Sequence, residues 1–173
     1  MNRKEQLAHN PPVDVIDAAG RPPLIDEAAQ IWAEATAARD GHEQVPALDV
    51  SRPVIQGVLD RSPRAFLLIA CSADGTAAGF AAVEPAPGSN ETTAQVSYIG
   101  VRPWMRGQGT GETLLLETRR RLKAIGYTSV ELSVYLDNHR ATALYQRLGW
   151  QAVGPPTAHP KTGKPEQRYE LRL

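Results

Sequence analysis

Three glycines that separate a strand-like run from a helix-like run are the feature that most constrains how this chain folds. These glycines are Gly107, Gly109 and Gly111. They follow an apolar run that ends at Val101, and an amphipathic run comes after them. Glycine tolerates positive φ and lets the backbone approach a ligand without a Cβ in the way. The first turn of a helix also presents N–H groups without intrahelical partners. The pattern therefore predicts an anion-binding loop at 106–111, with the cation of Arg106 beside it.

Two common phosphate-binding loops fit this spacing poorly. A nucleotide-hydrolase loop needs Gly-Lys-Ser/Thr, and no lysine lies between Gly75 and Lys123. A dinucleotide-binding loop needs G-x-G-x-x-G, whereas the spacing here is G-x-G-x-G. Glu131 stands at a suitable distance to bind a ribose, but it falls inside a predicted strand, and too little chain follows for the remaining parallel strands.

The hydrophobic pattern predicts a mixed α/β fold in the order β-α-α-β-β-β-α-β-α-β-β. Strands are predicted at 13–18, 65–71, 76–84, 92–101, 128–135, 150–153 and 167–173, and helices at 24–41, from Ser51, at 111–125 and from Asn138. Asp74-Gly75 is typical of a hairpin turn, Ser51 of a helix N-cap and Gly126 of a helix end. Proline pairs such as Pro155-Pro156 are taken to mark loops.

Length and composition indicate one ordinary globular domain. The chain has 173 residues, of which 42% are apolar and 22% charged, so we expect a flexible segment at 1–12 and a single domain at 13–173. The longest apolar run, Ala65–Cys71, is too short to cross a bilayer. Equal numbers of acidic and basic residues argue against a nucleic-acid partner. A single cysteine and a polar start favour the cytoplasm, with no membrane partner.

Two motifs together resemble those of the GNAT acyltransferases. The segment RGQGTG at Arg106–Gly111 is similar to the family signature Q/R-x-x-G-x-G/A, and a second family pattern follows it at Asn138, Ala141, Tyr145, Gly149 and Trp150. The similarity covers about residues 92–153. The resemblance implies a central mixed sheet of six to seven strands, splayed between the fourth and fifth strands and flanked by about four helices.

The resemblance also implies that an acetyl group moves from acetyl-CoA to a primary amine by direct attack. The coenzyme diphosphate would bind the loop residues, namely Arg106, Gly107, Gln108, Gly109, Thr110 and Gly111. The pantetheine arm would lie in the gap of the sheet. A free backbone N–H among Ile99, Gly100 and Val101 would then stabilise the developing oxyanion. Acetyl-CoA is thus the expected co-substrate, and the scattered histidines predict no metal.

Four side chains have roles that the resemblance suggests, each beside a plainer interpretation. Tyr145 is the expected proton donor to the leaving thiolate, although it can also simply pack in the core. Asn138 binds the coenzyme or caps its helix, and Arg140 binds a phosphate or faces solvent. The fourth strand carries no acid, so Glu84 is the candidate base, acting directly or through water; otherwise it is a solvated carboxylate at a strand end.

The sequence leaves the acceptor and the activity itself open. We expect a small-molecule or peptide amine as acceptor, and a homodimer is possible because such assemblies are common among similar proteins. A protein that binds acyl-CoA without catalysis is the alternative, since Tyr145 favours turnover whereas the missing acid on the fourth strand does not.

Overall fold

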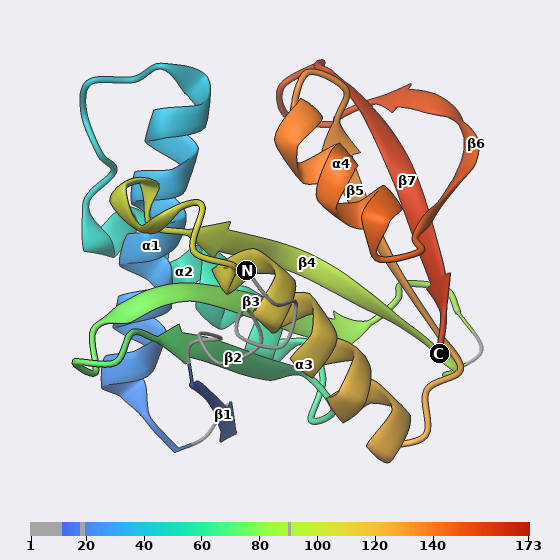
Figure 1. Cartoon of the computed structure of the whole chain (residues 1–173), viewed down its shortest axis with the longest axis horizontal. Coiled ribbons are helices and arrows are strands. Elements are labelled where there is room, and N and C mark those ends of the chain that lie inside the picture. The colour runs from blue at the N-terminus through green and yellow to red at the C-terminus, as the bar shows by residue number, and fades with distance from the viewer. Residues whose placement is uncertain (1–11, 18–19, 90) are drawn as a thin grey trace, which may run out of the picture.

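The computed structural model describes residues 12–17, 20–89 and 91–173 of the chain and forms one sheet with helices on both faces (Figure 1). The helices are α1 (Pro22–Asp40), α2 (Leu48–Asp60), the short 3-10 helix η2 (Pro103–Met105), α3 (Thr110–Ala124) and α4 (His139–Arg147). The strands are β1 (Val13–Asp17), β2 (Phe66–Cys71), β3 (Ala77–Pro85), β4 (Thr93–Val101), β5 (Ser129–Tyr135), β6 (Gln151–Ala158) and β7 (Pro165–Arg172). The predicted element order is confirmed.

The seven strands lie in the order β1-β2-β3-β4-β5-β7-β6, and β4 and β5 are the parallel pair among them. Their pairing covers only Thr93–Ser129, Ala94–Val130 and Gln95–Glu131, after which the two strands diverge (Figure 1). The predicted splay between the fourth and fifth strands is therefore confirmed. It divides the molecule into one part with β1–β4 and another with β5, α4, β6 and β7.

Two apolar clusters fill the space on either side of the sheet. In Figure 1, α3 lies in front of the sheet, and α1 and α2 lie behind it. The cluster beneath α3 includes Leu68, Val83 and Leu114, whereas the cluster beneath α1 and α2 includes Ile31 and Phe80. Because β2 and β3 are covered on both faces, they read as continuous apolar runs rather than as alternating ones.

Two local predictions are wrong. Ser51 does not cap α2, which begins at Leu48 with Ala47 as its N-cap, so Ser51 lies buried inside the helix. The apolar and helix-compatible residues before Ser51 extend the helix by a turn. Pro155-Pro156 also does not mark a loop but lies within β6, which runs past the predicted end at Val153. Proline is tolerated there because the pairing of β6 with β7 is interrupted between Val153 and Thr157, and because the other side of β6 is the edge of the sheet, so the missing N–H groups break no ladder.

Two further expectations concern the N-terminal segment and membrane-spanning helices. The segment 1–12, predicted to be flexible, lies outside the described residues except for Pro12. Among the helices of the described ranges, none combines the length and the apolar character that crossing a bilayer requires.

Close backbone approach at Gly79 gives a test of this packing. A Cβ there would lie 2.8 Å from the carbonyl oxygen of Gly100 and 2.9 Å from Cγ2 of Thr110. We expect Gly79→Ala to lower the free energy of unfolding by about 1–3 kcal/mol through overpacking. Gly57→Ala is the control, because nothing lies within 4 Å of its Cβ position in α2. That change should raise stability by up to about 1 kcal/mol. Urea denaturation measures both, and equal effects would contradict the packing at Gly79.

Candidate active site

The edge of β4 that faces the gap carries backbone N–H groups without a strand partner. The N–H of Arg102 donates to the carbonyl of Ala78 (2.9 Å), so these two residues form a hydrogen-bonded pair of the antiparallel β3–β4 ladder. Such pairs alternate along a ladder. Gly100 therefore directs its N–H toward β3, whereas Ile99 and Val101 direct theirs toward the side where β5 has diverged. Of the predicted oxyanion donors, Ile99 and Val101 have the required orientation.

The glycine loop that follows η2 presents free backbone donors. Gly107 and Gly109 have φ of 83° and 82°, in the left-handed region that favours glycine, and Gly109 is the N-cap of α3. The first backbone hydrogen bond of α3 runs from the N–H of Thr113 to the carbonyl of Gly109 (2.9 Å). Within the described part of the chain, no N–H from 107 to 112 has a hydrogen-bond partner. Such free donors are what the predicted anion-binding loop needs, and anion binding by this loop stays a prediction.

Two arginines flank these donors. The guanidinium of Arg140 lies 3.7 Å from the position that a Cβ on Gly107 would occupy. Burial lowers the pKa of Arg106, and the nearby charge of Arg140 lowers it further. Neither arginine forms an ion pair with a described residue. Two neighbouring cations without an ion-pair partner, next to free N–H groups, have the charge and the donors that binding of a multiply charged anion requires.

Helix α4 packs directly against the loop. Asn138 caps it, because its Oδ1 accepts a hydrogen bond from the N–H of Ala141 (3.2 Å), which confirms the capping interpretation. Whether Asn138 also binds a coenzyme stays a prediction. Gly111 leaves room for Leu144, whose Cδ2 lies 3.3 Å from the Cβ position of the glycine. An ion pair between Arg147 and Glu112 (2.7 Å) joins α4 to α3.

Tyr145 is a core residue of α4. Only 5% of it is exposed, and its ring contacts those of Trp150 and Tyr169, with centroids 5.9 Å and 6.1 Å away. Burial raises the pKa of Tyr145 to about 12. Its hydroxyl forms no hydrogen bond with a described residue, and because this pKa is far above 7 the phenol is protonated at neutral pH. The packing interpretation is confirmed, and the role as proton donor stays a prediction.

Glu84 is not the solvated carboxylate that one interpretation expected. Only 6% of it is exposed, and Arg61 donates hydrogen bonds to both of its oxygens, from Nε at 2.7 Å and from Nη2 at 2.9 Å. The hydroxyl of Ser97 donates to the same carboxylate. The expectation of a solvated end is wrong because α2 ends at Asp60, directly before Arg61, and so brings this arginine over the end of β3. Its role as base stays a prediction.

The α1 face of the gap has aromatic walls and a polar latch. Trp32 and Tyr98 meet edge to face with centroids 6.1 Å apart. The latch, which we define as Arg39, Asp40, Tyr135 and Lys164, joins the end of α1 to β5 and to the turn before β7. Its contacts are Arg39–Asp40 (2.8 Å), Lys164–Asp40 (3.3 Å) and both cations over the Tyr135 ring at 4.9 Å and 5.5 Å.

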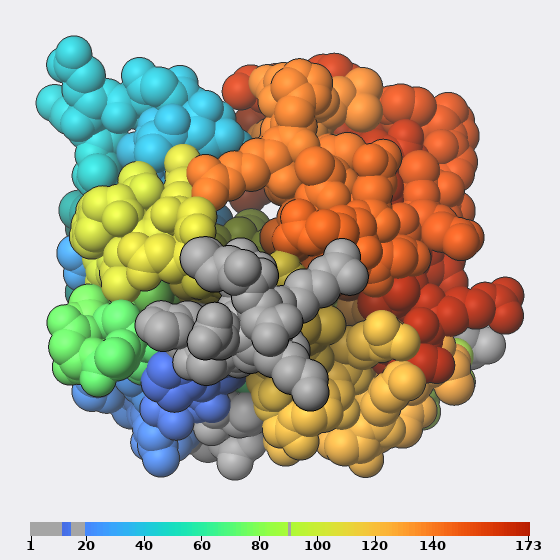
Figure 2. All heavy atoms as spheres, in the orientation of Figure 1, coloured from blue at the N-terminus to red at the C-terminus, as the bar shows by residue number. Residues whose placement is uncertain are grey.

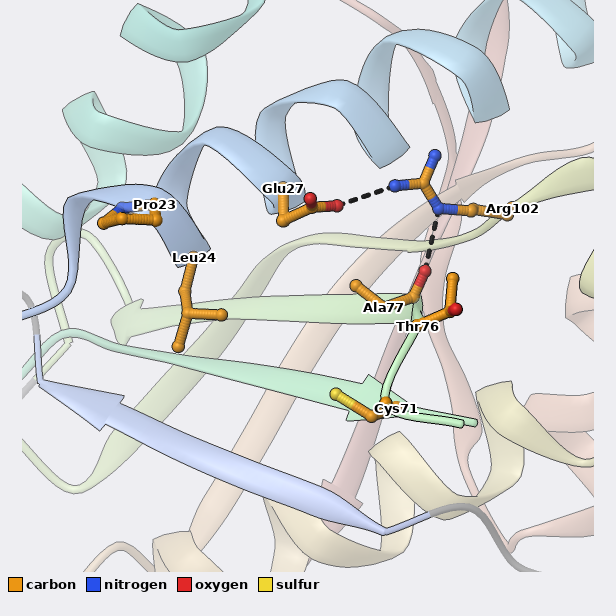
Figure 3. A pocket seen from close by; sticks show the side chains of 8 residues that line it. Pro23, Leu24, Glu27, Cys71, Thr76, Ala77 and Arg102 are labelled. Carbon is orange, nitrogen blue, oxygen red and sulfur yellow. Dashed lines mark hydrogen bonds and ion pairs between the residues drawn. The ribbon is translucent and has the colours of Figure 1, made fainter. Parts of the chain in front are cut away.

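Arg102 anchors the start of the glycine loop to α1. It is buried and binds Glu34, Glu27 and the carbonyl of Ala77 at distances of 2.7–2.8 Å. Figure 3 shows it beside a cavity of about 460 Å³, whose lining contains none of the predicted site residues. The sequence analysis missed this anchor. The sequence signal for this anchor was the pair of acids Glu27 and Glu34, which lie two turns apart in α1.

These elements surround a hollow. Figure 2 shows it between the yellow segment near residue 105, which leads into the glycine loop, and the orange segments after residue 135. Within the ranges that the structure describes, no group of three His, Cys, Asp or Glu side chains could hold a metal ion.

Solved acetyltransferases share this fold. The ribosomal-protein-S18-alanine N-acetyltransferase from Escherichia coli has a TM-score of 0.68 and 20% identity, over 94% of this chain and 94% of that one. A protein from Salmonella typhimurium, solved with its cofactor acetyl-CoA, has a TM-score of 0.68 and 17% identity, over 94% and 93% of the two chains.

The sequence comparison identifies the family. The model of the acetyltransferase (GNAT) family matches residues 25–150, so the chain belongs to that family. A mycothiol acetyltransferase from Paenarthrobacter aurescens (strain TC1) is 38% identical over 90 residues, which cover 51% of this chain and 28% of the relative. The match thus spans less than a third of that relative's length. The family resemblance noted in the sequence is confirmed.

The latch predicts a pH-dependent contribution to stability. Arg39 holds the pKa of Asp40 at about 2, and burial opposes this shift in part. Because this pKa lies below the unfolded value of about 3.9, the carboxylate stabilises the fold above pH of about 4. That contribution is lost as the pH falls toward 2. We expect Asp40→Asn to remove it, lowering the free energy of unfolding at pH 7 by up to about 1 kcal/mol.

Denaturation from pH 2 to 7 measures the effect. The difference between Asp40→Asn and the unchanged protein should shrink toward zero at the acid end. Asp74→Asn is a control, since the pKa of Asp74 is also about 2 but its partners lie in the β2–β3 turn. A constant difference for Asp40→Asn at all pH values would show that the latch does not depend on this charge.

Proposed function

We propose that this protein is an acetyltransferase that moves an acetyl group from acetyl-CoA to a primary amine. One observation carries the proposal: free backbone donors at 107–112 and two unpaired arginines adjoin the open edge of β4. A diphosphate would bind these donors and arginines, and an extended acyl-pantetheine arm would pair with the open edge of β4. Membership of the GNAT family supports the same reaction class.

The residues present fit the coenzyme. The N–H groups from Gly107 to Gly111, including those of Gln108 and Thr110, would hold the diphosphate with Arg106 and Arg140. Each left-handed glycine keeps the backbone accessible. The open edge of β4 would pair with the amides of the pantetheine arm. Acetyl-CoA supplies a thioester whose carbonyl carbon accepts a nucleophile.

The chain's own groups support direct attack by the amine. The nitrogen forms a bond to the acetyl carbon, the carbon–sulfur bond breaks, and the nitrogen releases a proton to solvent water, from which the proton donor to sulfur regains its own. The N–H of Ile99 or Val101 would donate to the carbonyl oxygen as negative charge develops on it. Tyr145, which remains protonated, would donate its hydroxyl proton to the departing sulfur.

The acceptor is an amine on a small molecule or a peptide. The similar proteins differ in the acceptors that their names give, since one is a ribosomal-protein-S18-alanine N-acetyltransferase and another a mycothiol acetyltransferase. The aromatic pair Trp32–Tyr98 and the latch bound the space that an acceptor would enter from the α1 face. This placement favours an acceptor small enough to pass between them.

Release of free thiol tests the proposal. Acetyl-CoA is mixed with a panel that contains amino acids, cysteinyl amines, polyamines and peptides starting with alanine. We expect saturable thiol release with at least one amine, together with a product heavier by one acetyl group. Binding of acetyl-CoA without thiol release from any amine would instead favour an acyl-CoA-binding protein that lacks turnover.

Gly109→Asp tests the diphosphate site. The carboxylate would place negative charge among the free N–H groups, so the Kd for acetyl-CoA should rise at least about tenfold. Gly75→Asp is the control, because Gly75 also has positive φ (86°) but lies in the β2–β3 turn. Calorimetric titration measures both variants. An unchanged Kd in a folded Gly109→Asp variant would contradict this location for the diphosphate.

Tyr145→Phe tests proton donation to sulfur. The variant should lower kcat on the order of a hundredfold and leave the Kd for acetyl-CoA nearly unchanged. Because the pKa of Tyr145 is about 12, its ionisation should cause no loss of wild-type kcat between pH 7 and 10. Tyr169→Phe, in the same aromatic cluster, is the control. A wild-type rate for Tyr145→Phe across this range would remove Tyr145 from the mechanism.

A further inference from the structure

Glu84 is a buried charge whose surroundings point to a task other than proton abstraction. Its side chain is 7% exposed, whereas that of its partner Arg61 is 58% exposed. Both carboxylate oxygens already accept hydrogen bonds from Arg61, and one of them also accepts a hydrogen bond from the hydroxyl of Ser97. Ser97 belongs to β4, the strand whose open edge borders the gap. Glu84 therefore connects the end of α2 to that edge.

Ser97 is the extra residue of a β-bulge. Along the β3–β4 ladder, Ala82 pairs with Tyr98 and Val83 pairs with Val96, so Ser97 has no partner on β3. A bulge of this kind puts two residues of one strand opposite one residue of the other and bends the bulged strand.

The bulge reverses the alternation of side chains along β4. Val96 lies in the cluster beneath α3, whereas Tyr98 packs against the cluster beneath α1 and α2. Residues two apart on a regular strand share a face. Since these two lie on opposite faces, the reversal occurs at Ser97.

The same reversal decides which backbone N–H groups face the gap. With the bulge, Gly100 directs its N–H to β3, and Ile99 and Val101 direct theirs to the open edge. A shift of register by one residue exchanges these orientations. Without the bulge, Ile99 would donate to β3, and no N–H at that residue would be available for an acyl carbonyl.

We propose that Arg61, Glu84 and Ser97 form a positioning unit that fixes the bulge and thereby aims the N–H of Ile99 into the gap. Glu84 is then a positioning residue and not the base that takes the proton of the amine. Arg61 orients the carboxylate through a two-bond fork, and the carboxylate holds the hydroxyl of the unpaired residue. The catalytic meaning of this unit rests on the proposed acetyltransferase function, whereas its structural effect does not.

The structural effect is measured without any ligand, by amide hydrogen exchange. In the unchanged protein, the N–H of Gly100 should exchange at least about tenfold more slowly than that of Ile99, because only the former donates to β3. We expect Ser97→Ala to reduce this contrast at least about tenfold and Ser97→Thr, which keeps the hydroxyl, to preserve it. An undiminished contrast in Ser97→Ala and in Glu84→Ala would overturn the proposal, whatever the protein's activity.

The catalytic effect is measured with acetyl-CoA and an amine that supports thiol release. Ser97→Ala and Glu84→Gln should each lower kcat roughly tenfold to a hundredfold, as expected when a donor is misplaced. The KM for acetyl-CoA and the shape of the pH profile of kcat should not change. Arg52→Ala is the control, because it removes an arginine–carboxylate ion pair between α2 and α1, Arg52–Asp26 at 2.6 Å, which includes no residue of β3 or β4.

Two results separate positioning from proton abstraction. A base at Glu84 would make Glu84→Gln lose the rise of kcat with pH while Ser97→Ala stays fully active, and that result would overturn the proposal. Equal losses in Ser97→Ala and Glu84→Gln with an unchanged pH profile support it. If the unchanged protein releases no thiol from any amine, the proposed function fails, and the exchange measurement alone decides on the positioning unit.

Discussion

The early end of the parallel pairing between β4 and β5 is the constraint on which the site depends. A backbone N–H that lies at a strand edge inside a protein needs a partner, and divergence of the two strands leaves those of Ile99 and Val101 without one from β5. In the proposed function, the extended arm of an acyl carrier would provide the missing strand-like partner. The sheet thus forms a ligand site from backbone alone, which explains why the residues lining this edge carry no obvious chemistry.

Charge on the two sides of the sheet is arranged in opposite ways. At the glycine loop, Arg106 and Arg140 stand together without acids, so their charge is available to a ligand. On the α1 face, the carboxylates of Asp40 and Glu84 are each held by cations. The first arrangement favours a strongly negative ligand, and the second neutralises the wall that an incoming amine would meet. Such a separation suits a reaction between a polyanionic donor and an uncharged nucleophile.

The sequence predicts the parts of the site that local rules govern. The glycine spacing, the cap at Asn138 and the helical position of Tyr145 follow from patterns within a few residues. The bulge could not be predicted, because Val96 and Tyr98 read as one regular face although they lie on opposite faces. Pairs such as Arg61–Glu84 and Asp40–Lys164 were also missed. Their partners are far apart in the chain, and only the folded sheet brings them together.

Few polar contacts join the two parts of the molecule across the short β4–β5 seam. Three residue pairs of ladder connect the two parts of the sheet, and single ion pairs, Arg147–Glu112 on one side and Asp40–Lys164 on the other, bridge them further along. Partly exposed ion pairs contribute little free energy, so they resist rotation about the seam only weakly. One apolar cluster also spans the seam, with Leu114 of α3 and Tyr145 of α4 among its members, so it is shared side-chain packing rather than surface charge that holds the two parts at a fixed separation.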